Sequence, residues 1–136
     1  MLNNFVKNNN TAKIKWLFLF LAIFDTLLGF LTLFFPQYLE QLLQPNITHT
    51  NLWILQRTGI VWLGFAFAEF KAFLKPQSYW LKIVAFLRLM DVPADFSWVI
   101  LGKGMGFWGY LSLIFSFCFN FICGIVLWKV KIRNDI

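Results

Sequence analysis

Six charged residues lie inside long apolar stretches of this chain, apart from the lysines that flank the second connector. They are Asp25, Arg57, Glu69, Arg88, Asp91 and Asp95. Each charge near the centre of a bilayer costs at least about 2.5–3.5 kcal/mol on insertion scales, so such residues persist only where they face one another or a wet cavity. We therefore expect an interior cluster that binds a ligand, exchanges a proton or fixes the register of the helices.

The helical period places several of these residues on shared faces. Spacings of three and four put Arg88, Asp91 and Asp95 on one stripe of the third apolar stretch. In the fourth stretch Asn120 stands four residues after Ser116, which indicates a second polar stripe. The pattern predicts a helix bundle with a polar interior and a lipid-facing apolar coat.

Depth along the stretches predicts which charges pair. A rise of about 1.5 Å per residue places Arg57 level with Asp95, and Asp25 level with Asp91 and close to Arg88. We expect an ion pair between Arg57 and Asp95, and a cluster of Arg88, Asp91 and Asp25. Because two close carboxylates in a low-dielectric site cannot both ionise cheaply, we expect Asp25 or Asp91 to hold a proton.

Two further contacts are expected on the second stretch. Glu69 points away from Arg57 and lies near the inner boundary, so Lys82 across the short connector is its expected partner. Gly64 and Ala68 stand four residues apart, a spacing of small residues that lets another helix backbone approach closely.

The composition predicts the elements that hold these residues. The chain has 136 residues, of which 60% are hydrophobic, 21% aromatic and 13% charged. An ordinary soluble domain has about 25% charged residues, so a soluble, disordered or fibrous protein is excluded. Four stretches are long enough to cross a bilayer, at residues 16–35, 52–74, 79–101 and 107–128.

The connectors between these stretches are short, which predicts an all-α membrane protein with an antiparallel bundle of four transmembrane helices. Residues 1–15 form a polar leader and residues 129–136 a basic tail. The first connector is expected to hold a short interfacial helix. Pro93 removes a backbone donor and crowds the preceding turn, so the third helix is expected to kink or break there.

The basic residues predict the orientation. Nine lie before the first helix, around the second connector or after the fourth helix, whereas the outer connectors carry only Lys103. This bias places both termini in the cytoplasm and the chain in the inner membrane as a multi-pass protein. The net charge of +6 is therefore mostly a topology signal, and nucleic acid is not an expected partner.

The sequence gives no reason to expect a metal or a cofactor. His49 is the only histidine and lies in the first connector without a second metal-ligating residue near it. Cys118 and Cys123 match neither a redox nor a metal spacing and are expected to pack as small side chains.

The chain also resembles a known family. Phe24-Asp25, Gly29, Pro36, Arg57-Thr58-Gly59 and Gly64, with the lysine-rich inner connector, are similar to the pattern of DoxX-like four-helix inner-membrane proteins. The resemblance implies a four-helix inner-membrane fold, and several members are tied to quinone-linked redox enzymes. The segment from Arg88 to Asp95 has no counterpart in that pattern, so no catalytic residue is carried over.

The leading hypothesis is a small integral membrane protein whose polar interior binds a small or lipophilic ligand, as an accessory subunit of a membrane redox or lipid complex. The expected ligand-binding residues are Arg57, Arg88, Asp95, Asn120 and Trp62. In addition to the bilayer and this ligand, a membrane protein partner or a second copy of the chain is an expected partner.

Two alternatives remain open, so the sequence leaves undecided whether the protein is an enzyme. The first is a membrane enzyme, either an isomerase or a quinone-linked oxidoreductase component, that uses Asp25 or Asp91 as acid or base. The second is a structural subunit in which intramembrane ion pairs only set the helix register.

Overall fold

The computed structural model describes residues 2–45, 52–101 and 104–130, and the chain is all-helical over these ranges. Its helices are α1 (Leu2–Phe34), α2 (Pro36–Leu43), α3 (Leu52–Leu74), α4 (Ser78–Leu101) and α5 (Phe107–Lys129). The ends of α3, α4 and α5 lie within one residue of the expected bounds. In contrast, α1 begins at Leu2, so most of the expected leader extends this helix.

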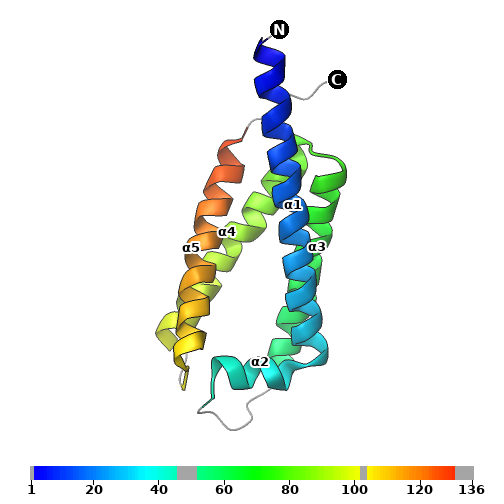
Figure 1. Ribbon diagram of the computed structural model, residues 1–136. Helices are drawn as coiled ribbons and strands as arrows, with labels where there is room; N and C mark the ends of the chain where they lie inside the picture. The colour runs from blue at the N-terminus through cyan, green and yellow to red at the C-terminus, as the bar shows by residue number, and fades with distance from the viewer. Residues whose placement is uncertain (1, 46–51, 102–103, 131–136) are drawn as a thin grey trace.

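The long helices pack as two pairs. α1 lies along α3, α4 lies along α5, and the contact between the pairs is smaller (Figure 1). α1 begins and α5 ends at one end of the molecule, which we call the terminal end, and α3 is joined to α4 there. At the opposite end, the α2 end, α2 crosses between the pairs. Neighbouring long helices are therefore antiparallel.

α2 is the short helix expected in the first connector. Pro36 stands in its first turn, where the missing N–H is not needed and the fixed φ favours a helical start. Its backbone meets α5 directly, because the Gly106 N–H donates to the Leu43 carbonyl at 3.0 Å. A Cβ on Gly109 would stand 2.3 Å from the same carbonyl oxygen, so a glycine is needed for this approach.

The buried core lies toward the terminal end. It is formed by apolar side chains from all four long helices, namely Phe18, Leu21, Ala68, Ala72, Leu81, Val84, Ala85, Cys123 and Leu127. These positions follow spacings of three and four on each helix, as expected for core-facing stripes. Cys123 packs in this core as expected, whereas Cys118 is exposed.

The close approach of α1 and α3 occurs at Gly29 and Gly59. A Cβ on Gly59 would stand 2.8 Å from the Gly29 carbonyl oxygen, and a Cβ on Gly29 would meet the Leu63 side chain at 2.8 Å. The expectation of a close contact at Gly64 is wrong, because a Cβ there would meet nothing within 4 Å. The Gly29–Gly59 contact sets how α3 is rotated about its axis.

We expect Gly59→Ala to lower the free energy of unfolding by about 1–3 kcal/mol, because the added methyl meets backbone that cannot turn aside. Gly64→Ala is the matched control, and it should leave stability unchanged or raise it by up to about 1 kcal/mol through helix propensity. Reversible unfolding in mixed detergent micelles measures both. Equal effects at the two glycines would contradict the described packing.

α4 passes through Pro93 as one continuous helix, so the expected break does not occur. The Ser97 hydroxyl donates to the Pro93 carbonyl at 2.7 Å, four residues back along the helix. Serine hydroxyls within helices commonly donate such a hydrogen bond to the carbonyl one turn earlier. The kink at Pro93 stays a prediction.

Within the described ranges, two helices are long and apolar enough by themselves to cross a membrane, over Ala12–Phe34 and Phe107–Lys129. Large apolar side chains also cover the outer faces of all the long helices; Phe20, Phe67, Phe86 and Phe115 are more than half exposed. Soluble proteins rarely expose apolar patches of this extent.

Candidate functional site

Arg88 on α4 joins all four long helices. Its Nη2 lies 2.6 Å from Asp25 Oδ2 on α1 and also donates to Glu69 Oε1 on α3. Its Nη1 donates to Asn120 Oδ1 on α5 at 3.2 Å. All four of these residues are at most 3% exposed. In addition, the guanidinium lies 5.9 Å from the centroid of the Phe65 ring, a cation–π distance.

The direction of helical side chains explains why these groups meet. A helical Cα–Cβ bond tilts toward the N-terminus of its own helix. α4 begins at the terminal end, so Arg88 reaches toward that end; α3 begins at the α2 end, so Glu69 reaches the opposite way. The two side chains therefore converge although their backbones lie at different depths.

Asn120 links this buried cluster to a second group of oxygens. Its Nδ2 lies 3.3 Å from Asp95 Oδ2, 3.4 Å from Asp91 Oδ2 and 3.2 Å from Ser116 Oγ. An amide nitrogen carries only two protons, so it cannot donate a full hydrogen bond to all three acceptors at once. Asp91 and Asp95 therefore keep hydrogen-bonding capacity for another group.

The network holds more acid than base. Asp25, Glu69, Asp91 and Asp95 surround the single guanidinium of Arg88, and the ion pairs between described residues join it only to Asp25 and Glu69. Two buried polar atoms, Glu69 Oε2 and Arg88 Nε, have no hydrogen-bond partner in the described part of the chain. Buried polar atoms are usually satisfied, so these two indicate further hydrogen-bonding capacity.

Burial decreases from this network toward α2 on α4 and α5, whereas Thr32 on α1 and Gly59 on α3 stay buried where they meet. On α4 Asp91 and Asp95 are only half-buried, and on α5 the polar stripe becomes exposed at Ser112. The α2-facing side of the network is therefore its accessible side.

The expected pair between Arg57 and Asp95 is not formed. Arg57 is exposed, and its guanidinium lies 5.7 Å from the Trp53 ring centroid, one turn toward the N-terminus of α3. Because Gly59 faces α1, the Arg57 side of α3 is turned away from the interior. Asp95 instead accepts from Asn120, and Trp62 lies half-buried on α3.

The expected pair between Glu69 and Lys82 is also wrong. Glu69 is buried against Arg88, whereas Lys82 is exposed on α4. Sequence reasoning thus missed a member of the site, although one signal was present: Glu69 stands four residues after Phe65 and three before Ala72, on the face that packs inward.

The two acid–base candidates have different surroundings. Asp25 is buried and paired with Arg88, as expected. Asp91 is half-buried and is joined to Arg88 by hydrogen bonds through Asn120, so it lies at the edge of the expected cluster. His49 lies outside the described residues, among which no group of three or more His, Cys, Asp or Glu side chains is placed to hold a metal ion.

Comparison of the chain with protein-family models, with curated proteins and with solved structures gives no match. The DoxX-like resemblance therefore stays a prediction from the residues named above.

Proposed function

We propose that the protein is a multi-pass inner-membrane protein in which the four long helices cross the bilayer, α4 bends at Pro93 and both termini face the cytoplasm. The apolar outer faces and the two long apolar helices support this topology. Six described lysines support the orientation, because each lies in the half of its helix, or in the connector, that is nearer the terminal end. They are Lys13, Lys15, Lys71, Lys75, Lys82 and Lys129. The DoxX-like resemblance is a further reason for this topology.

We further propose that the network binds a small or lipophilic ligand on its α2-facing side, at Asp91 and Asp95. The observation that carries this is the position of Asn120, which ties two half-buried carboxylates to a fully buried ion cluster. Intramembrane acidic residues that face an accessible interior mark binding sites and proton paths. The excess of carboxylates favours a ligand that brings a hydrogen-bond donor or a positive charge.

In this proposal Arg88 is an anchor and not the group that contacts the ligand. The guanidinium is buried and donates to Asp25, Glu69 and Asn120, so these contacts hold it between the helices, away from the accessible carboxylates. The ligand would identify the larger assembly, which we propose to be a membrane redox or lipid complex with this chain as an accessory subunit.

A structural subunit is the second candidate, and one observation favours it. Arg88 contacts α1, α3 and α5 at once, so the cluster joins the two helix pairs without any ligand. Buried ionic groups can set the register of packed helices without any ligand. The two functions differ in one requirement, because only ligand binding depends on the carboxylates of Asp91 and Asp95.

The test is the molecule that co-purifies with the protein in detergent, identified by native mass spectrometry and extraction. We expect Asp91→Asn to weaken binding tenfold or more, and so to lower the occupancy, since a hydrogen bond to a charged group contributes about 1.5–3 kcal/mol, while the fold is kept. Arg57→Gln is the matched control, because Arg57 lies outside the network, and it should leave the occupancy unchanged.

Two results would oppose ligand binding. Unchanged occupancy in Asp91→Asn would remove Asp91 from the site. A bare wild-type protein would favour the structural subunit, above all if it is isolated only together with another polypeptide.

A further inference from the structure

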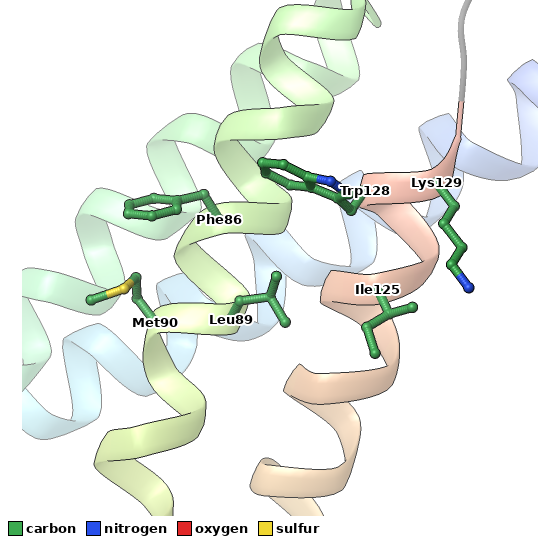
Figure 2. Close-up of a pocket in the computed structure, with 6 residues that line it drawn as sticks. All are labelled: Phe86, Leu89, Met90, Ile125, Trp128 and Lys129. Carbon is green, nitrogen blue, oxygen red and sulfur yellow. The ribbon is translucent and has the colours of Figure 1, made fainter.

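A cavity lies on the outside of the molecule between α4 and α5, near the terminal end. It has a volume of about 530 Å³ and is lined by Phe86, Leu89 and Met90 from α4 and by Ile125, Trp128 and Lys129 from α5 (Figure 2). Sites for small molecules usually have about 300–1,000 Å³, so this cavity is large enough for part of a ligand.

The packing of α4 on α5 forms the floor of this cavity. A Cβ on Gly124 would stand 2.7 Å from Leu89 Cγ, so the glycine lets Leu89 sit deep between the helices. Phe86 and Met90 stand along one side, and Trp128 lies across the end (Figure 2). Because Phe86, Met90 and Trp128 are each more than half exposed, the cavity is open along the outer surface.

The lining combines apolar walls with the flexible side chain of Lys129, whose amine points away from Trp128 in Figure 2. Lys129 is the last residue of α5 and has no ion pair with a described carboxylate. Asp91 and Asp95 lie farther toward α2 on α4, and no acidic residue lines the cavity. A tryptophan indole at the rim adds an N–H donor of the kind that lies at lipid headgroups.

We propose that this cavity binds an anionic phospholipid of the cytoplasmic leaflet, with an acyl chain against Phe86, Leu89, Met90 and Ile125 and the phosphate at Lys129 and Trp128. Basic residues between membrane helices on the cytoplasmic side favour anionic headgroups, and each contributes about 1 kcal/mol near the surface. The inference rests on the proposed membrane topology and is independent of the ligand of the polar network.

The test uses the full chain reconstituted in vesicles of phosphatidylcholine with phosphatidylglycerol, followed by gentle extraction and native mass spectrometry of retained lipid. We expect phosphatidylglycerol to be retained about fivefold over phosphatidylcholine after correction for vesicle composition, which corresponds to about 1 kcal/mol. Lys129→Gln should remove this preference. Lys71→Gln, which removes an exposed lysine from the same end on α3, should keep it.

A second variant fills the cavity without changing charge. Met90→Trp should reduce the retention of both lipids, because the larger side chain occupies the space of the acyl chain. Equal retention of both lipids by the wild type, or an intact preference in Lys129→Gln, would overturn this inference alone. Protein that stays in the aqueous fraction would overturn the membrane topology as well.

Discussion

Replacing Arg88 with methionine should lower the free energy of unfolding by about 3–5 kcal/mol. This is the usual cost of removing one partner from a buried ion pair, because the other charge is left without compensation. Here two carboxylates, those of Asp25 and Glu69, lose their guanidinium at once, and Asn120 loses a donor. Reversible unfolding in mixed detergent micelles, followed by circular dichroism, measures the loss.

Two further variants make this expectation specific. Arg57→Met removes the other arginine of the apolar stretches, which is exposed and contacts only the Trp53 ring among the described interactions. Its cost should be about 0.5–1 kcal/mol. Adding Asp25→Leu and Glu69→Leu to Arg88→Met should restore much of the lost stability, because apolar side chains can replace a buried ion cluster.

An Arg88→Met variant as stable as Arg57→Met would show that the cluster does not hold the helices together. Failure of the apolar replacements to restore stability would point to a packing defect at this position and not to an uncompensated charge.

The helices and the core of the site followed from the sequence. Apolar stretches of about twenty residues predicted the four long helices, since a run of that length is typical of a helix that can cross a bilayer. The period of 3.6 placed Asp25 and Arg88 on interior faces, and the structure joins them. Asn120 was expected on the interior face of α5, where it lies.

The partners of Glu69 and Arg57 did not follow from the sequence, for two physical reasons. The expected pairs rest on the depth of each Cα atom along its helix. Arg88 and Glu69 reach toward each other from antiparallel helices, so their charged groups meet between the levels of their Cα atoms. The rotation of α3 depends on a contact between distant residues, Gly29 and Gly59, whereas the local small-residue spacing at Gly64 predicted the opposite face.

The site has two parts that differ in burial. The guanidinium of Arg88 with Asp25 and Glu69 is buried, so its members are held in place by packing as well as by charge. Asp91 and Asp95 are half-buried and joined to it only through Asn120. Changes in the first part should therefore act on stability, and changes in the second part on binding.

The buried part has two carboxylates, Asp25 and Glu69, for the one guanidinium of Arg88. We therefore expect the effects of replacing the two carboxylates on the free energy of unfolding to be strongly non-additive. Asp25→Asn and Glu69→Gln should each cost about 1 kcal/mol or less, because the remaining carboxylate still neutralises Arg88 and the amide oxygen still accepts a hydrogen bond. The double variant leaves a buried guanidinium without a counter-charge in contact. It should cost about 3–5 kcal/mol.

A double-mutant cycle measures this coupling, which should fall at the upper end of the range of about 0.5–3 kcal/mol seen for residues in contact. Asp91→Asn combined with Asp95→Asn is the matched control on the accessible side. That pair should be tolerated without loss, since neutral amides do not repel each other and both side chains are only half-buried. An additive result for Asp25 and Glu69 would mean that each carboxylate acts through its own packing, and that the excess acid of the network resides elsewhere.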